Sequence, residues 1–322
     1  MAPELIALDW GTSSLRAFLM AAGQALEQRQ SAHGIQHLPQ PGREGFEQAF
    51  KAIAGDWVQQ WPHLPVLACG MVGSAQGWRE APYVRCPVDM RTLAESHVSI
   101  ESGLGPSVTI TPGVLYDQAG ELPDVMRGEE TQIAGALLVN HQWADRSCIV
   151  LPGTHSKWAH VEGGRITRYS TYMTGEMFDV MRRYSILGRL MPQGDVTDVD
   201  LDSNDRAFAL GVSTAQQSRP GALLHELFAT RTLGLTGRFP ATSLTEYLSG
   251  LLIGEELIAG LTSAGDLSAI PLVMVGDPAL CARYQMALQL LGSSTGQLLD
   301  NTAPSGLWLL AQTAGLVGKT RP

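Results

Sequence analysis

The sequence repeats one short pattern at two distant places. Residues 11–14 and 153–156 share Gly-Thr-x-Ser, and their glycines are 142 positions apart. Each copy follows a short apolar run and precedes another strand-like run, so each is predicted to be the loop of a β-hairpin. A glycine in such a loop lets a ligand approach the backbone, and nearby hydroxyl groups can donate hydrogen bonds to oxyanions. We therefore expect two α/β domains, each with one loop, that bind a polyphosphate from both sides.

The two copies differ at the position two residues before the glycine, which is Asp9 in the first copy and Leu151 in the second. Only the first loop therefore carries a carboxylate that could hold Mg²⁺, directly or through water, beside phosphate groups. For either loop alone, an ordinary Gly-Thr hairpin is the alternative. The paired occurrence with matching flanks favours phosphate binding.

Length and charge limit the class of protein. The chain has 322 residues, which at about 150 residues per domain predicts two domains, 1–143 and 144–322, divided at the polar segment 141–146. The net charge of −9 argues against nucleic acid or a membrane surface as a partner. The start lacks a signal peptide, no apolar run could span a bilayer, and the four cysteines resemble buried thiols. We expect a cytoplasmic protein, and a homodimer stays open.

Apolar periodicity predicts the main elements. Segment 193–205 is interpreted as an acidic surface loop, and Ser243 with Glu246 as a capping box. Strands are expected at 5–8, 15–20, 65–69, 148–151, 157–162, 165–172 and 272–275, and helices at 46–57, 129–139, 243–261, 279–291 and about 305–317.

Several longer strings match a known family. They are 8–16, 69–74, 77–78, 126–132, 151–158 and 174–177. On these strings the chain is similar to the 2-dehydro-3-deoxygalactonokinase family, which belongs to the actin, sugar-kinase and Hsp70 superfamily, and the strings at 126–132 and 151–158 are the most specific to it. The resemblance implies two ribonuclease-H-like, actin-type ATPase domains with mixed sheets around an interdomain cleft, and a last helix that can cross back to the first domain.

The resemblance also implies roles for matched positions. Asp9 would face the metal. The first phosphate loop would comprise Gly11, Thr12, Ser13 and Arg16, and the second Gly153, Thr154, His155 and Ser156. Lys157 is a further candidate for a phosphate or substrate contact, and a solvent-exposed lysine at a strand edge is the alternative.

Related kinases place a catalytic carboxylate at the start of the helix before the second phosphate loop. Glu130 matches that register, and Glu129 is the second candidate. The base must lie within hydrogen-bond reach of the attacking hydroxyl group. Glutamate replaces the usual aspartate, so the choice between the two stays open. Stabilisation of the helix dipole is the alternative role for either one.

The segment 273–276, which runs into a helix, resembles the adenosine loop of the superfamily, and this resemblance implies an adenosine site in the second domain at Gly276 and Asp277. Gly250 either lines the same pocket or allows tight helix packing. The acceptor's carboxylate is expected to meet an arginine, because guanidinium binds carboxylates in bidentate fashion. The substrate-site candidates are Gly73, Ser74, Arg79, Arg85, Arg168, Gly175 and Glu176.

The resemblance implies transfer of a phosphoryl group from Mg-ATP to the 6-hydroxyl group of 2-dehydro-3-deoxy-D-galactonate, in galactonate breakdown. A kinase for another sugar or sugar acid is the nearer alternative. A non-catalytic nucleotide-binding regulator of the same fold is the more distant one.

Overall fold

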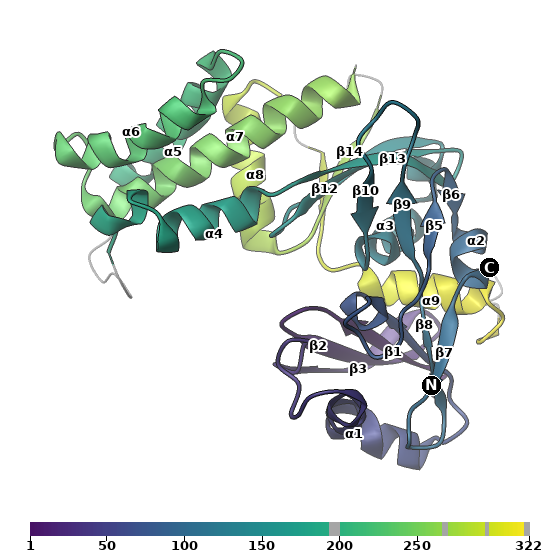
Figure 1. The fold of residues 1–322 in the computed structure, drawn as a ribbon. Coiled ribbons are helices and arrows are strands. Elements are labelled where there is room, and N and C mark those ends of the chain that lie inside the picture. The colour runs from purple at the N-terminus through teal and green to yellow at the C-terminus, as the bar shows by residue number, and fades with distance from the viewer. Residues whose placement is uncertain (193–199, 266–269, 294–295, 319–322) are drawn as a thin grey trace. The chain divides into compact units, whose positions relative to one another are not determined.

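A continuous apolar run, residues 5–8, is buried on both faces and places the first strand of the chain inside a six-stranded sheet. The computed structural model describes residues 1–192, 200–265, 270–293 and 296–318 (Figure 1). In the first sheet β1 pairs antiparallel with β2 and parallel with β4, and β4 pairs parallel with β8. The order is β3-β2-β1-β4-β8-β7, with bounds β1 (Leu5–Trp10), β2 (Leu15–Ala21), β3 (Gln24–Ser31), β4 (Val66–Cys69), β7 (Val98–Glu101) and β8 (Ser107–Ile110).

The two faces of β1 have different tasks. Ile6, Leu8 and Trp10 join a buried core with the apolar residues of α1 (Arg43–Gln60), which recur at three and four positions as a helix requires. Because successive side chains of a strand point to opposite faces, Asp9 points to the other face. There α9 (Ala303–Thr313) packs against β1 and β4, and also against α3 (Glu129–Val139).

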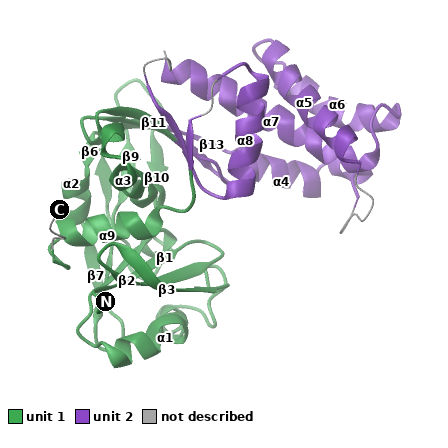
Figure 2. Cartoon of the chain, turned by 180° about the vertical axis from the view of Figure 1, so that it is seen from behind, with its two compact units in different colours: residues 1–149, 159–169, 299–322 green, residues 150–158, 170–298 purple. Residues whose placement is uncertain are grey.

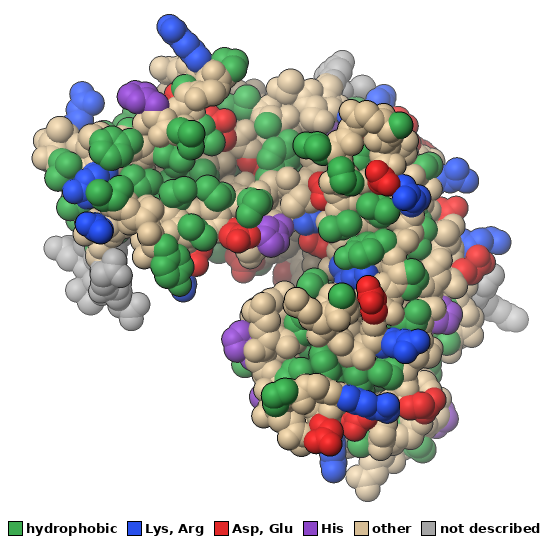
Figure 3. Space-filling view, viewed as in Figure 1, with side chains coloured by type: hydrophobic (Ala, Val, Ile, Leu, Met, Phe, Trp, Pro, Cys, Tyr) green, Lys and Arg blue, Asp and Glu red, His purple; other side chains and the backbone are tan. Residues whose placement is uncertain are grey.

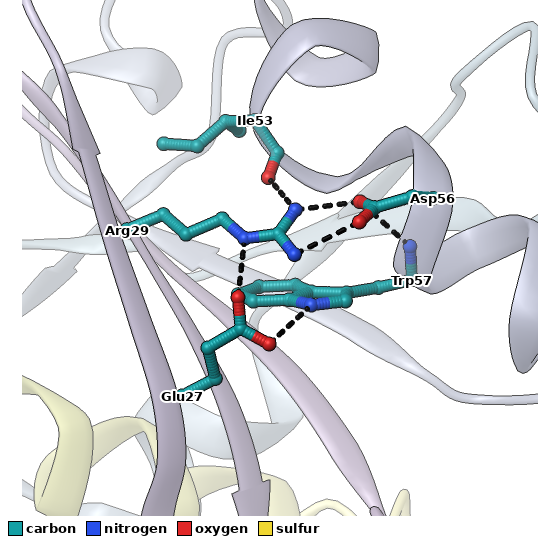
Figure 4. A network of polar contacts seen from close by, with 5 residues as sticks. All are labelled: Glu27, Arg29, Ile53, Asp56 and Trp57. Carbon is teal, nitrogen blue, oxygen red and sulfur yellow. Dashed lines mark hydrogen bonds and ion pairs between the residues drawn. The ribbon is translucent and has the colours of Figure 1, made fainter.

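An ion-pair network fastens α1 to β3 (Figure 4). The Arg29 guanidinium donates to both carboxylate oxygens of Asp56, to Glu27 and to the Ile53 carbonyl oxygen, and it lies over the Trp57 ring. Trp57 Nε1 donates to Glu27 in turn. The carboxylates raise the pKa of Arg29, and Arg29 lowers the pKa of Asp56.

A small second sheet follows in sequence. Its order is β10-β9-β5, with β9 antiparallel to β10 and parallel to β5. Its neighbours along the chain are the short helix α2 and the 3₁₀ turns η1 and η2. The bounds are β5 (Tyr83–Arg85), β9 (Gly113–Tyr116), β10 (Asp124–Met126), α2 (Met90–Glu95), η1 (Met71–Gly73) and η2 (His141–Ala144).

The third sheet repeats the strand order of the first. Its order is β15-β14-β11-β12-β13-β6. From β13 to β15 the strands follow the same relative order as β3-β2-β1-β4-β8, which is the order of a ribonuclease-H-like domain. The expected α/β class with mixed sheets and a duplicated core is thus confirmed. The bounds are β6 (Val88–Asp89), β11 (Arg146–Leu151), β12 (Ser156–Glu162), β13 (Arg165–Tyr172), β14 (Leu272–Val275) and β15 (Gln297–Leu299).

Helices make up most of the remaining second half. Gly211 and Gly250 let α5 and α7 approach closely, and the helices share a core with the turn η3. Figure 3 shows hydrophobic side chains on the surface of these helices, and Leu224, Phe228 and Leu235 of α6 are exposed. The bounds are α4 (Thr174–Tyr184), η3 (Leu187–Leu190), α5 (Leu201–Gln217), α6 (Leu223–Leu235), η4 (Ala241–Ser243), α7 (Leu244–Ala264) and α8 (Pro278–Leu290).

Two compact units divide the chain at other points than the sequence suggested (Figure 2). Unit 1 comprises 1–149, 159–169 and 299–322, and unit 2 comprises 150–158 and 170–298. The boundary predicted at 143/144 therefore differs, because parts of the third sheet and α9 group with unit 1. Helix α9 groups with unit 1.

Three further expectations concern the cysteines, membrane-spanning helices and the acidic segment. The four cysteines are buried and free, as predicted. No helix in the described part of the chain has the length and apolar character needed to cross a bilayer. The acidic-loop prediction for 193–205 is wrong from Asp200 onward, because Asp200 caps α5 by accepting from the Ser203 amide. Residues 193–199 lie outside the described residues.

Candidate active site

The first Gly-Thr loop is a four-residue hairpin turn, as predicted. It joins β1 to β2, and the Gly11 amide donates to the Ser14 carbonyl oxygen at 2.9 Å. The carbonyl oxygens of Gly11 and Thr12 accept from the amides of residues 35 and 36, which fixes the loop from outside. Thr12 and Ser13 are exposed, so their hydroxyl groups are accessible to a ligand.

Three carboxylates gather beside this loop. Asp9 ends β1 and pairs in register with Cys69 at the end of β4, while α3 brings Glu129 and Glu130 to the same place. Parallel strands present their carboxyl ends at one sheet edge, where α/β proteins bind ligands. Burial raises the pKa of Asp9, Arg16 opposes that rise, and Glu129 adds to it. The Arg16 Nη1 to Asp9 Oδ2 distance is 3.5 Å.

Glu130 is sealed inside unit 1. Its exposed fraction is 0 %, and its Oε2 accepts from the Gly128 amide at 2.7 Å while the Thr131 hydroxyl donates to its Oε1 at 3.0 Å. Burial, reinforced by Glu129, raises the pKa of Glu130 to about 7. Glu129 is half-buried and accepts from the Arg127 amide at 3.0 Å. Of the two candidate bases, only Glu129 has part of its surface open to a substrate.

Gly128 explains why α3 begins so close to the end of β4. Its φ is 109°, and a Cβ atom there would lie 3.2 Å from the Gly70 Cα atom. A residue with a side chain would be strained at this φ and would push the two segments apart. The glycine therefore brings the first turn of α3 next to Asp9.

The described residues fit Mg²⁺ only with help from a ligand. No group of three or more His, Cys, Asp or Glu side chains in the described ranges could hold a metal ion alone. Mg²⁺ usually takes one or two carboxylates and completes its shell with water and phosphate oxygens. Asp9 supplies one such carboxylate beside the first loop.

The unit 1 candidates for the acceptor site separate into two groups. Gly73 and Ser74 lie in and after η1, at the end of β4 and therefore at the same sheet edge as Asp9. Arg79 is exposed, and Arg85 is 64 % exposed and paired with Asp117 at 2.6 Å. Arg168 is also exposed. The structure places none of these arginines beside Gly73.

Unit 2 contains a cavity of about 570 Å³ at the second Gly-Thr loop. Its volume is within the range of small-molecule sites, about 300–1,000 Å³. The Arg283 guanidinium and the Glu246 carboxylate form an ion pair of 2.7 Å in its wall. The lining residues are Pro152, Gly153, Thr154, Thr174, Gly175, Phe178, Glu246, Ser249, Leu252, Ile253, Asp277, Leu280, Arg283 and Tyr284.

The start of α4 closes onto this loop. A Cβ atom at Gly175 would lie 2.5 Å from the Gly153 carbonyl oxygen, so only glycine allows the approach. The Glu176 amide donates to the Thr154 carbonyl oxygen, and the Glu176 carboxylate bonds to His155 Nε2. Gly175 and Glu176, predicted for the substrate, thus belong with the loop and the cavity of unit 2.

A network of buried hydrogen bonds supports the second Gly-Thr loop. The Gly153 amide donates to the Ser156 hydroxyl, which bonds to the Tyr284 hydroxyl at 3.0 Å. Tyr284 and the Trp158 indole N–H donate to the Glu256 carboxylate, which is 3 % exposed. Burial raises the pKa of Glu256, and its donors oppose that rise. Ser156 therefore orients the loop backbone, although the sequence assigned it directly to phosphate.

The remaining unit 2 candidates can be placed individually. Lys157 is 4 % exposed, so the alternative of a solvent-exposed edge lysine is wrong; its Nζ donates to the His155 carbonyl oxygen at 3.1 Å. Gly276 follows β14, and Asp277 lines the cavity and caps α8 through the Leu280 amide. Gly250 packs on the Phe208 backbone of α5, so it serves helix packing.

Sequence reasoning missed other residues that the structure brings to these sites. The Asn301 side chain lies close enough to Asp9 to lower its pKa, across 292 positions of sequence, and Arg127 precedes the glutamate pair. Tyr284 and Glu256 lie on helices that sequence predicted, but their apolar surroundings gave no polar signal. Pairing of this kind depends on tertiary packing, which short motifs do not encode.

Comparison with known proteins gives a consistent result. Residues 9–310 match the family model of 2-keto-3-deoxy-galactonokinase. A 2-dehydro-3-deoxygalactonokinase from Escherichia coli (strain K12) is 34 % identical over 304 residues, covering 94 % of this chain and 95 % of the relative. A Rhizobium meliloti (strain 1021) protein, provisionally given the same name, is 34 % identical over 89 % of both chains. A crystal structure from Sinorhizobium meliloti, also provisionally so named, has a TM-score of 0.83 at 32 % identity and covers 96 % of this chain and 98 % of its own.

Proposed function

The chain belongs to the 2-keto-3-deoxy-galactonokinase family, and from that premise we propose that it transfers the γ-phosphoryl group of ATP to the 6-hydroxyl group of 2-dehydro-3-deoxy-D-galactonate. The products are ADP and the 6-phosphate ester. The bond between the γ-phosphorus and its bridging oxygen breaks, and a bond to the acceptor oxygen forms. The hydroxyl proton passes to a carboxylate of the protein.

The unit 2 cavity is assigned to the nucleotide. Gly153 and Thr154 at one end supply the loop that meets phosphate groups, and apolar residues such as Phe178 and Leu252 line the wall. Backbone amides of such a loop bind phosphate oxygens without needing a lysine. Gly276 and Asp277 lie where β14 turns into α8, which supports adenosine binding at that end.

Glu129 is assigned as the general base in place of Glu130. It is half-buried at the start of α3, and burial with both carboxylate oxygens engaged keeps Glu130 from a substrate. A base must reach the hydroxyl proton before its pKa matters. Glu130 then has the task of holding the Gly128 turn, and with it the position of Glu129.

Asp9 is assigned to Mg²⁺ and the phosphate groups, with Thr12 and Ser13 donating hydroxyl hydrogen bonds. When bound, the metal supplies neutralisation of phosphate charge during transfer. Asp9 and Glu129 place two carboxylates at this edge beside the single guanidinium of Arg16, which favours a divalent cation there.

The observation that carries the proposal is that the carboxylates of Asp9, Glu129 and Glu130 lie together near the end of β1. The test is an ADP-release assay on the full chain with three kinds of acceptor: 2-dehydro-3-deoxyhexonates, hexonates and hexoses. We expect turnover with the ketodeoxy acids and at most slow turnover with the others. Turnover with hexoses alone would replace the substrate assignment, and nucleotide binding without any transfer would support the regulator alternative.

A further inference from the structure

Arg127 is a buried arginine, and two of its guanidinium nitrogens have no hydrogen-bond partner among the described residues. It is 8 % exposed, its Nη2 donates to the Ala81 carbonyl oxygen at 2.8 Å, and its guanidinium lies over the Tyr83 ring at 4.3 Å. Its Nε and Nη1 atoms are buried without a hydrogen-bond partner among the described residues.

Such donors need an explanation, since most buried polar groups in proteins are satisfied. Leaving a buried donor unpaired is costly, and more so when the group is charged. Guanidinium nitrogens form their strongest bonds with the oxygens of a carboxylate or a phosphate. The unpaired Nε and Nη1 atoms of Arg127 lie on different edges of the guanidinium, so each can donate separately to an anionic ligand.

The guanidinium lies at the acceptor side of unit 1. A Cβ atom built on Gly73 would be 3.0 Å from Arg127 Nη1 and 2.9 Å from Ile110, so η1, β8 and Arg127 meet there. The hydroxyl oxygens of Ser74, after η1, and Thr111, after β8, are also buried without a partner in the described structure. Unsatisfied donors thus concentrate at the edge of the sheet that also carries Asp9.

Arg127 is tied to the proposed base through the same turn. Its backbone amide donates to the Glu129 carboxylate, while its side chain extends away to Gly73 and Tyr83. A linear six-carbon acid carries its carboxylate at one end and its terminal hydroxyl at the other. One turn of chain, 127–129, therefore presents a cation for one end of the acid and a carboxylate for the other.

We infer that Arg127 binds the carboxylate of the acceptor acid, with the Ser74 hydroxyl as a second donor, and so selects acids over neutral sugars. The inference rests on the proposed function. Because Nε and Nη1 are enclosed here, binding of the acid requires a local opening beside them. Arg79, Arg85 and Arg168, which the sequence nominated, are all exposed.

The test compares the ketodeoxy acid with its uncharged carboxamide. In the wild-type chain the acid should have the lower KM. Arg127→Gln should raise the KM for the acid about 10- to 150-fold, the factor that corresponds to a charged hydrogen bond. The KM for ATP and the KM for the carboxamide should change little. The surface variant Arg91→Gln, on the exposed face of α2, is the control and should match wild type.

Loss of folding is separated from loss of recognition by two further measurements. Arg127→Lys keeps a charge with fewer donors, and Ser74→Ala removes only the second donor, so both should shift the acid's KM by smaller factors. The acid without ATP should raise the Tm of wild type and not that of Arg127→Gln, because only a bound ligand stabilises the fold.

The outcomes distinguish this inference from the proposed function. If wild type phosphorylates the acid and all variants keep its preference over the carboxamide, Arg127 is structural and the inference is wrong. If Arg127→Gln raises the KM for the acid and the KM for the carboxamide equally, the inference is wrong as well. If wild type does not phosphorylate the acid at all, the proposed function fails and the inference falls with it.

Discussion

Adjacent residues on a helix can have different surroundings, and Glu129 and Glu130 are the example. Sequence register favoured Glu130, but neighbouring helical side chains point in directions about 100° apart. The structure turns Glu130 into the protein and leaves Glu129 half-buried. A motif can therefore locate the start of α3 without determining which carboxylate faces the acceptor.

Glu129→Gln should lower kcat by about 100- to 10,000-fold, the contribution of a positioned general base, with little change in either KM. Glu130→Gln should lower kcat less, because the amide keeps an acceptor for the Gly128 N–H. Glu95→Gln, at an exposed position of α2, is the control. Steady-state kinetics decides: a larger loss in Glu130→Gln than in Glu129→Gln would restore the assignment made from sequence.

Glu130 should also make stability depend on pH. Its pKa is raised to about 7 from an ordinary 4.5. Between those values the folded chain keeps a proton that the unfolded chain has lost, so the free energy of unfolding falls as pH rises. Glu130→Gln removes this pH dependence. Between about pH 4 and about pH 8, its free energy of unfolding should therefore rise relative to that of wild type by on the order of 3 kcal/mol. Urea unfolding across that range measures it, and parallel curves for the two proteins would contradict the burial argument.

The tertiary neighbours of Arg127 and Asn301 could not be predicted from the sequence. Arg127 stands inside a family-specific string, yet its importance lies in unpaired donors that only packing reveals. Asn301 meets Asp9 because α9 returns to β1. Neither has a local pattern that predicts its neighbours.

At the scale of elements, strong periodicity and turn chemistry predicted most of what positions the site. The helix at 129–139 and the strands at 165–172 and 272–275 occur at those bounds. Helices α5 and α6 were missed, because α6 is apolar on several sides and has no clear stripe. The prediction of a capping box at Ser243 is wrong. The Ser243 hydroxyl donates to the Asn204 side chain, and Glu246 forms an ion pair with Arg283 in the cavity wall.

The contact from α8 to the second loop makes an element-scale prediction. Tyr284→Phe removes the hydroxyl group that links Ser156 to Glu256 and leaves a buried carboxylate oxygen without that donor. We expect a loss of about 1–3 kcal/mol in the free energy of unfolding. The KM for ATP should rise several-fold, and the KM for the acid should stay unchanged.

Tyr184→Phe is the matched control for that variant, because Tyr184 belongs to α4 and is 79 % exposed. Denaturant unfolding and ATP-dependent kinetics should leave it at wild-type values. If Tyr284→Phe loses stability but keeps the KM for ATP, the network supports the core of unit 2 without orienting the Gly153 loop.

At the scale of the whole chain, the repeated Gly-Thr pattern correctly predicted two hairpin loops, and each lies between the first two strands of a repeated strand order. The division into units was not predictable from a polar segment near residue 143. It depends on where α9 and parts of the third sheet pack, and these contacts join residues far apart in sequence. Family membership rests on residues 9–310, whereas the proposed substrate choice depends on a few side chains of unit 1.

Identification of the phosphorylated product tests the central claim most directly. The full chain is incubated with Mg-ATP and 2-dehydro-3-deoxy-D-galactonate, and phosphorus–proton NMR locates the ester while ADP is quantified in parallel. The account predicts an ester at carbon 6 in amounts equal to the ADP formed. ADP released without an ester, or an ester at another position, would contradict it.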